Sequence, residues 1–540
     1  MAFHTDMSSY TSINQDFEPL MLKLRELLNY FFSLSVPVKL LYIFAFYTVF
    51  FTLIYIPIRF VYRAYFDPLS KIPGPKWVLI SGSYNKLYWD VLPGKGYGEL
   101  HSYILKLHQQ YGHIVRTGPR WVAINDIELY QEVYKVNSRF AKNPHFYNHP
   151  IGNESVAELV NIHEAADRRA AYNPYFSKQA IRKFEEPIQE KVSYFLDRIE
   201  AVGDKIPLDR AFRCLMADVI TTYSYGKNAD ALSHPEFHPD VLLAFSVALG
   251  SLGFQNTFPI TVTCLEWLLD HGLPRFLLPR PVKNTVRFVE ECRDIIMALK
   301  GKYSKGEKDV HTIFAETFED DEKSGRKALT YRQLQQDAVL IFSAGADTTA
   351  HGLTTLVYHL VQNPHIEEML LNELKGIMPS PTSEITETVA DGLPILTAVI
   401  KETLRISQGI PSCLPRDVPA GGVDFLGYHL PATTTLQFPA FTYHNSPDIF
   451  PDPTKWDPTR WLVGDTREME KYWIPFGRGS RICLGLNLAW SELLVTSARL
   501  VRRFEMGFAE DFKHEDMEWK AVFIPVTKGR LSIWVKRREE

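Results

Sequence analysis

The sequence predicts a mostly α-helical fold with small β-sheets and one N-terminal transmembrane helix. Three observations predict it: an uncharged apolar run near the N-terminus, long apolar-periodic segments in the middle, and short β-rich segments between turn residues. The chain has 540 residues, of which 46% are hydrophobic, so it can bury a large core.

The predicted transmembrane helix covers residues 40–62. Its uncharged part, Leu40–Ile58, has 19 residues between Lys39 and Arg59, close to the ~20 that cross a bilayer as a helix. The alternative is a buried core helix. Basic residues slightly favour a cytosolic location for everything after the helix. Residues 1–39 form a separate N-terminal segment.

A proline-rich hinge, residues 63–76, is expected after the anchor. Proline fixes φ and restricts the residue before it, so Asp67–Pro75 should be a stiff, non-helical spacer. We find no linker or internal repeat beyond it, and we interpret residues 77–540 as one domain.

Helices and strands are expected at defined places in this domain. The apolar pattern predicts one long helix over Tyr331–Gln362, ended by Asn363-Pro364. Further helices are expected over His365–Ile377, Leu396–Ile406 and about Leu484–Glu505. Strands are expected over Ile114–Thr117, Trp121–Ile124, Val423–Tyr428, Thr434–Phe438, Ala521–Val526 and Leu531–Val535.

Charge and cysteine content exclude several classes of function. The net charge is −4, so nothing points to nucleic acid. The five cysteines are scattered and form no Cys-x-x-Cys pair, which argues against a disulfide framework or a zinc site. They fit a catalytic domain in a reducing compartment.

Cys483 is the strongest chemical signal. Residues 476–485 read Phe-Gly-Arg-Gly-Ser-Arg-Ile-Cys-Leu-Gly. Arg481 and the N-terminus of the following helix should lower the pKa of the Cys483 thiol. Gly479 permits a positive φ, Gly485 permits close approach to a cofactor, and Phe476 can shield the sulfur. The alternative is a buried free cysteine in a glycine-rich turn.

The segment resembles the haem-binding signature of the cytochrome P-450 family, Phe-x-x-Gly-x-Arg-x-Cys-x-Gly, at every position. The resemblance implies the cytochrome P-450 fold and haem b as cofactor, with Cys483 as the axial ligand of the iron. It places Phe476, Gly479, Arg481 and Gly485 at the haem.

Ala344–Thr349 interrupts the long helix with residues that disfavour helix interiors, Gly345, Asp347 and Thr348. We expect a local opening that admits a small molecule, and the alternative is a simple kink. The segment resembles the family's acid–alcohol pair, which relays protons to dioxygen and carries over onto Asp347 and Thr348.

Glu402 and Arg405 lie three residues apart on one helix face. Alone they could be a surface ion pair worth under ~1 kcal/mol. They resemble the family's structural Glu-x-x-Arg pair, and Arg460 resembles the third member. We assign all three to holding the cysteine loop.

Cations are needed for the haem propionates. Arg168-Arg169 resembles the arginine that an early helix directs at the haem, although the tryptophan usual four residues earlier is replaced by Glu164 or Ala165. Which arginine points inward stays open. Arg416 resembles a further propionate partner. The alternative for each is a solvated surface arginine.

The substrate pocket is expected to be apolar. Ala344, Ile410, Pro411 and Ile524 fall near family positions that line it. The apolar region Val241–Leu278 resembles the part that caps the pocket, with ordinary core helices as the alternative.

The resemblance implies a monooxygenase of the endoplasmic reticulum membrane, single-pass with a cytosolic catalytic domain. It would oxidise a hydrophobic small molecule with O2 and NADPH-derived electrons, in terpenoid or polyketide secondary metabolism as in fungal members. The implied partners are NADPH-cytochrome P-450 reductase, cytochrome b5 as a further candidate, and membrane lipid. The alternatives are an electron-independent isomerase or dehydratase and a non-enzymatic haem sensor. On this topology the sequon at Asn153 stays unmodified.

Overall fold

The computed structural model describes residues 22–23, 25–26, 29–80, 97–147, 154–239, 242, 257–305, 312–322 and 325–539. The chain forms two compact units, residues 1–70 and 71–540. The sequon residue Asn153 and the stretch 243–256 of the predicted cap lie outside the described residues.

The N-terminal unit holds one continuous helix, Val36–Phe66. It consists of α2 (Val36–Phe50), a π-helical turn, α3 (Ile56–Val61) and a second π-helical turn. Among the described residues it is the one helix long and apolar enough to cross a membrane. The predicted span of residues 40–58 lies wholly inside it.

The segment after this helix is less extended than predicted. Pro68–Lys71 forms a 3-10 turn, so the non-helical prediction is wrong there. The Asp67 carboxylate stabilises this turn by accepting from the Leu69 N–H at 2.8 Å. Farther on, Pro73 accepts a backbone hydrogen bond from Arg116 at 2.8 Å. The last hinge residues are therefore attached to the β1 strand.

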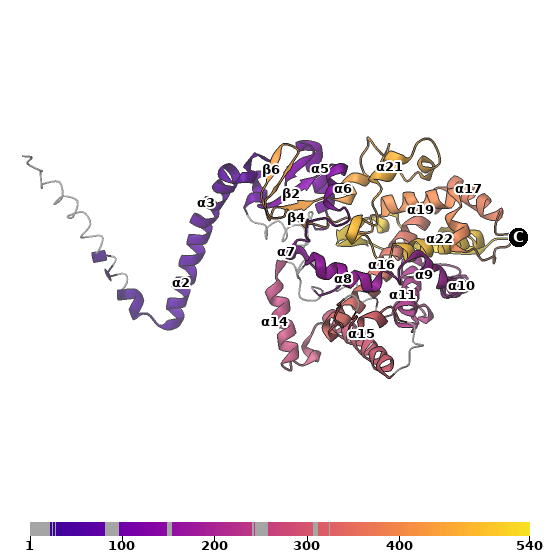
Figure 1. Cartoon of the computed structure of the whole chain (residues 1–540), viewed down its shortest axis with the longest axis horizontal. Helices are drawn as coiled ribbons and strands as arrows, with labels where there is room; N and C mark the ends of the chain where they lie inside the picture. Colours follow the sequence, from indigo (N-terminus) through magenta and orange to yellow (C-terminus); the bar gives the residue numbers. More distant parts are fainter. Residues whose placement is uncertain are drawn as a thin grey trace, which may run out of the picture. The chain divides into compact units, whose positions relative to one another are not determined.

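Helices dominate the second unit, as predicted (Figure 1). Those before the long central helix are α5 (Leu100–Tyr111), α6 (Ile127–Val133), α7 (Pro144–Tyr147), α8 (Ile162–Tyr172), α9 (Lys178–Lys183), α10 (Glu185–Val202), α11 (Leu208–Tyr225), α14 (Pro259–Asp270) and α15 (Arg280–Ser304). Those from the central helix onward are α16 (Tyr331–Gln362), α17 (Pro364–Lys375), α18 (Glu387–Asp391), α19 (Pro394–Ser407), α20 (Ala440–His444), α21 (Arg467–Tyr472) and α22 (Leu486–Arg503).

Within the described residues the strands form four small sheets. The largest has the order β1 (Ile114–Arg116), β2 (Trp121–Ile124), β7 (Thr435–Gln437), β4 (Arg416–Asp417), and another has the order β3 (Ile206–Pro207), β11 (Ser532–Arg537), β8 (Phe504–Phe508). The others are the hairpins β5 (Val423–Phe425)–β6 (Tyr428–Leu430) and β9 (Trp519–Val522)–β10 (Ile524–Thr527). In Figure 1, β2, β4 and β6 lie beside α5 and α6.

Two single-strand predictions are wrong because a turn divides each segment. Val423–Tyr428 turns at Leu426, whose φ is +52°, and Ala521–Val526 turns at Phe523, whose φ is +71°. A bulky residue rarely adopts a positive φ, so neither Leu426 nor Phe523 is itself a turn signal. In the first segment the signal is Gly427, whose φ is +79°.

The α16 helix has the predicted bounds. Thr330 and Gln333 form a capping box at its start, and Pro364 begins the next helix. Every residue from Tyr331 to Gln362 is α-helical, so the segment Ala344–Thr349 does not divide the helix. A Cβ on Gly345 would lie 2.7 Å from Ile220 Cγ1 of α11. Close packing of α11 on α16 explains this glycine.

The core lies where α11, α16, α19 and α22 pack on one another. The α22 helix follows Cys483 directly in the sequence and packs on both α16 and α19. The fold thereby brings together three separate motifs: the cysteine segment, the acid–alcohol segment of α16 and the Glu-x-x-Arg segment of α19.

Substitution of Gly345 by Ala should destabilise the catalytic unit by about 1–3 kcal/mol, because the added methyl overlaps the stiff Ile220 side chain. Gly352→Ala is the matched control, since its Cβ would lie 3.5 Å from Leu493, an ordinary contact, and alanine favours the helix. Denaturant unfolding measures both. Equal stability of the two variants would refute the packing explanation.

Candidate haem-thiolate site

The segment that carries Cys483 forms a tight turn before α22. The Cys483 N–H donates to the Phe476 carbonyl at 2.9 Å. Gly477 and Gly479 both have φ of +69°, a conformation that favours glycine. A Cβ on Gly479 would lie 1.7 Å from the Tyr134 carbonyl oxygen. Only glycine therefore fits at position 479.

The Cys483 thiol is accessible to solvent and yet surrounded by protein. Burial raises the pKa of the Cys483 thiol, while the Gly485 N–H and the Arg169 guanidinium act to lower it. The prediction that Arg481 lowers the pKa of Cys483 is wrong, because the charge that acts on this thiol is that of Arg169. The effect of burial on the pKa of Cys483 is larger than the effect of Arg169.

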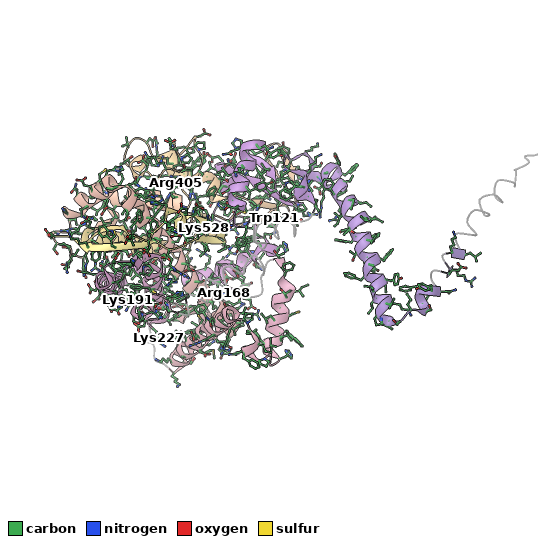
Figure 2. All side chains as sticks on the ribbon, turned by 180° about the vertical axis from the view of Figure 1, so that it is seen from behind. Trp121, Arg168, Lys191, Lys227, Arg405 and Lys528 are labelled. Atoms are coloured by element: carbon green, nitrogen blue, oxygen red, sulfur yellow. The ribbon has the colours of Figure 1, made fainter. Side chains whose placement is uncertain are left out.

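Arg169, and not Arg168, reaches the cysteine turn. Arg169 Nη2 donates to the Ile482 carbonyl at 2.9 Å. Arg168 is 3% exposed and donates to Asp337 Oδ2 and to the Glu154 carbonyl, each at 3.1 Å. An ion pair within the protein thus takes the place of the cofactor contact predicted for Arg168. Figure 2 shows Arg168 and Arg405 in separate parts of the unit.

Three further cations, Arg416, Arg481 and Lys142, lie close to Arg169. Burial, Arg416 and Arg169 together lower the pKa of Arg481 to about 10. Burial, Arg416, Arg481 and Arg169 lower the pKa of Lys142, while the Glu158 carboxyl acts to raise it. Like charges that depress one another's pKa values in a buried place indicate a site built for an anion.

The protein partners of these arginines do not neutralise them. Arg481 donates to the carbonyls of Val156 and Leu159. Arg416 is buried and lies over the Tyr134 ring, 4.9 Å from its centroid. None of these partners is a carboxylate.

The residues present fit a haem group. Haem brings two propionate carboxylates, which Arg169, Arg416 and Arg481 would neutralise, and an iron that binds a thiolate such as Cys483. A Cβ on Gly485 would meet no protein atom within 4 Å. Protein packing therefore does not require this glycine, and close approach of a flat group explains it.

The acid and the alcohol of α16 have different surroundings. Thr348 is half-buried, and its hydroxyl donates to the Ala344 carbonyl at 2.7 Å. Asp347 is 7% exposed, and its Oδ1 accepts from Arg213 Nε at 2.5 Å. Arg213 also donates to the Leu242 carbonyl at 3.2 Å. Asp347 is therefore held in an ion pair.

Glu402, Arg405 and Arg460 meet, as predicted from the sequence. Arg405 forms a two-point pair with Glu402 at 2.8 and 2.9 Å, and Arg460 Nε donates to Glu402 at 3.1 Å. Trp461 Nε1 also donates to this carboxylate, at 3.0 Å. Glu402 is fully buried and Arg405 is 1% exposed. This cluster is a buried charge network with its hydrogen bonds satisfied.

Aromatic contacts connect this cluster to the cysteine turn. The Trp461 ring contacts Trp473, and Trp473 contacts Phe476, each edge to face. Trp473 Nε1 donates to the Lys401 carbonyl at 3.0 Å, beside Glu402. Phe476 is the residue that accepts from the Cys483 N–H. The network and the turn are thus continuous.

The predicted pocket residues remain a prediction. Ala344 is exposed although it lies on a central helix. Ile410 and Ile524 are half-buried and Pro411 is buried. In the predicted cap, α14 presents Ile260 and Trp267 to the surface; they are 76% and 57% exposed. The interpretation of this helix as ordinary core is therefore wrong.

Three residues of the site escaped sequence reasoning. Lys142 is buried, with its ammonium 4.1 Å from the centroid of the Tyr147 ring. Arg213 binds Asp347 across 134 positions of sequence. Glu492 of α22 is a buried acid, 2% exposed. No sequence motif marks any of them.

Fold and site together define a haem-thiolate protein. The cytochrome P450 family model matches residues 81–532. Cytochrome P450 monooxygenase macH of Penicillium terrestre is 32% identical over 90% of this chain and 96% of its own length. The monooxygenases sdnE of Sordaria araneosa, 31% identical over 85% of this chain and 92% of its own, and TRI4 of Trichoderma arundinaceum, 32% over 84% and 87%, are similar as well. The chain belongs to the cytochrome P450 family.

Replacement of Arg405 by Ala should cost about 3–5 kcal/mol and abolish haem incorporation, because it leaves the Glu402 carboxylate buried with too few partners. Haem content per protein and denaturant unfolding measure the effect. Arg467→Ala is the control: it removes an exposed pair with Asp465 and should change stability by under about 1 kcal/mol. Normal haem content in the Arg405 variant would contradict the structural role.

Proposed function

We propose that this protein is a membrane-anchored haem-thiolate monooxygenase that oxidises an apolar small molecule, of the terpenoid or polyketide class. The observation that carries the proposal is Cys483 in a glycine-rich turn beside Arg169, whose charge acts in turn on Arg481. Family membership and the three monooxygenases named above support it. Haem, when bound, supplies the activation of O2.

The overall reaction consumes the substrate, O2, two electrons and two protons, and gives the hydroxylated product and water. The sequence carries no Gly-x-Gly-x-x-Gly motif for a nicotinamide or flavin. The electrons therefore come from an NADPH-dependent reductase, with cytochrome b5 as a second donor. We place the catalytic unit on the cytosolic side of the endoplasmic reticulum, anchored by Val36–Phe66.

The remaining roles in the proposed function belong to side chains of this protein. Cys483 binds the iron, and Arg169, Arg416 and Arg481 neutralise the propionates. Glu402, Arg405 and Arg460 hold the cysteine turn. Ala344, Ile410, Pro411 and Ile524 line the substrate pocket.

We assign Thr348 and Asp347 to the supply of protons for the reaction. The Thr348 hydroxyl already donates to Ala344, so its lone pairs are free to accept a proton. Asp347 is ion-paired to Arg213. It has to release Arg213 before it can take part.

The alternatives predicted from the sequence, an isomerase or dehydratase without electron supply and a haem sensor, receive no support from these comparisons. One experiment separates all three functions. Purified protein is incubated with an apolar terpenoid and polyketide panel under labelled O2, with and without NADPH and reductase. The proposal predicts products that carry one label and form only with both. Unlabelled product without NADPH would indicate the isomerase, and spectral binding without product the sensor.

Thr348→Val should lower product formed per NADPH consumed by about tenfold, because the variant cannot accept and pass on a proton. Haem content should not change, since the substitution keeps the volume. Thr348→Ser, which keeps the hydroxyl, is the matched control and should stay coupled. NADPH consumption, hydrogen peroxide and product are measured together. Full coupling in the Val variant would remove Thr348 from proton supply.

A further inference from the structure

Residues 154–159 supply the hydrogen-bond acceptors of Arg481. The Val156 carbonyl accepts from Arg481 Nη1 at 3.5 Å, and the Leu159 carbonyl accepts from Nη2. Both acceptors are uncharged, so they orient the guanidinium and leave its positive charge available to an anionic group. The position of Arg481 therefore depends on the position of this segment.

The segment has no regular structure of its own. Residues 154–159 belong to neither a helix nor a strand. A further carbonyl of the segment, that of Ala157, accepts from Lys142 Nζ. The two cations that the segment binds repel each other, since Arg481 is one of the groups that lower the pKa of Lys142. An irregular segment that holds two like charges needs an attachment to the rigid part of the fold.

Asp337 of α16 binds this segment and is fully buried. Its Oδ1 accepts from the Val156 N–H at 2.6 Å. Val156 therefore binds Asp337 through its N–H and Arg481 through its carbonyl. The neighbouring residue adds a second attachment, because Gln336 Oε1 accepts from the Glu154 N–H at 2.7 Å. Two consecutive residues of the central helix thus hold two backbone groups of the segment.

The other oxygen of Asp337 holds α8. Arg168 Nη1 and the Tyr172 hydroxyl both donate to Oδ2, at 3.1 and 2.8 Å. These two residues lie one turn apart on α8, so their bonds to one oxygen fix the rotation of the helix about its axis. Arg169, the next residue, projects about 100° away from Arg168 and donates to the Ile482 carbonyl at 2.9 Å. The position of Arg169 thus also depends on Asp337.

The partners of Asp337 suit a carboxylate. Arg168, Tyr172 and the Val156 N–H are all donors, and an ionised carboxyl group accepts at both oxygens. Burial raises the pKa of Asp337, while these same three groups act to lower it. The charge of Arg168 balances that of Asp337, so the pair adds no net charge near the cysteine turn.

We propose that Asp337 is a positioning residue for the haem propionates. Through Val156 it sets the place of Arg481, and through α8 it sets the place of Arg169. This rests on the proposed function, in which the two arginines neutralise the propionates. Asp337 itself contacts neither haem nor substrate. A residue of the central helix thereby controls how firmly the haem is held and, through the two cations, the reduction potential of its iron.

The test removes the ion pair without a change in net charge, in the double variant Arg168→Met with Asp337→Leu. Apolar replacement of a buried ion pair is often neutral for folding, so a pair with a purely structural role can be lost without effect on the haem. The proposal predicts transfer of haem to excess apomyoglobin about tenfold faster than from wild type, because the hydrogen bonds that fix a charged group are lost. The ferrous carbon-monoxide band should remain, since Cys483 keeps its own contacts.

The reduction potential is the second readout of the double variant. It should be lower than in wild type, because a cation held at a propionate stabilises the reduced, less positively charged iron. Haem release at the wild-type rate, or an unchanged potential, would each overturn the proposal. Loss of the carbon-monoxide band would indicate a general collapse of the site and would equally contradict a specific role in propionate binding.

Asp218→Leu is the matched control. Asp218 of α11 is 1% exposed and accepts from the N–H groups of Ala231 and Leu232 at 2.7 and 3.0 Å. This variant therefore also leaves buried backbone donors without their acceptor, but at the turn Ala231–Ser233 and not at residues 154–159. It should release haem like wild type. Equally fast release from the control would attribute the effect to general loosening and refute the proposal.

Tyr172→Phe covers the case in which the double variant fails to fold. It removes one donor to Asp337 and keeps the ring, and it should release haem severalfold faster than wild type; an unchanged rate would contradict the proposal. Haem release and potential are both measured without turnover. Wild-type protein that binds haem but makes no product with NADPH and reductase would instead contradict the monooxygenase function, and the two failures are thereby distinguishable.

Discussion

A buried thiol resists ionisation, yet iron binds the thiolate, and this conflict shapes the site around Cys483. Burial raises the pKa of Cys483. The Gly485 N–H and Arg169 act against this effect, and a haem iron bound at this site would supply further positive charge. In the proposed site, Cys483 and the iron would therefore stabilise each other.

The same constraint explains the rigidity of the surroundings. Arg169, Arg416 and Arg481 are held close together although they repel one another, and they gain their full stabilisation only from an anionic ligand. The backbone of the cysteine turn fits so closely that Gly479 admits no side chain. The Glu402–Arg405 network, connected through Trp473 and Phe476, keeps this turn in place. The stable packing of the rest of the fold thus holds together a site whose neighbouring like charges are destabilising.

Local features could be predicted from the sequence and tertiary pairings could not. The cysteine segment is contiguous, and α16 is marked by its apolar period and its terminal signals, so both were accessible. The pairing of Arg213 with Asp347 depends on how α11 crosses α16, which no residue pattern encodes. The close approach of Gly345 to Ile220 could not be predicted for the same reason, since Ile220 lies on another helix. The turn at Phe523 went unpredicted because its positive φ is imposed by the hairpin.

Thiolate ligation by Cys483 is the central claim, and the ferrous carbon-monoxide spectrum tests it most directly. Haem-loaded wild-type protein should show the long-wavelength Soret band that a thiolate ligand produces, and Cys483→Ala should lose it. A wild-type spectrum without that band, or a Cys483→Ala variant that keeps it, would contradict the account.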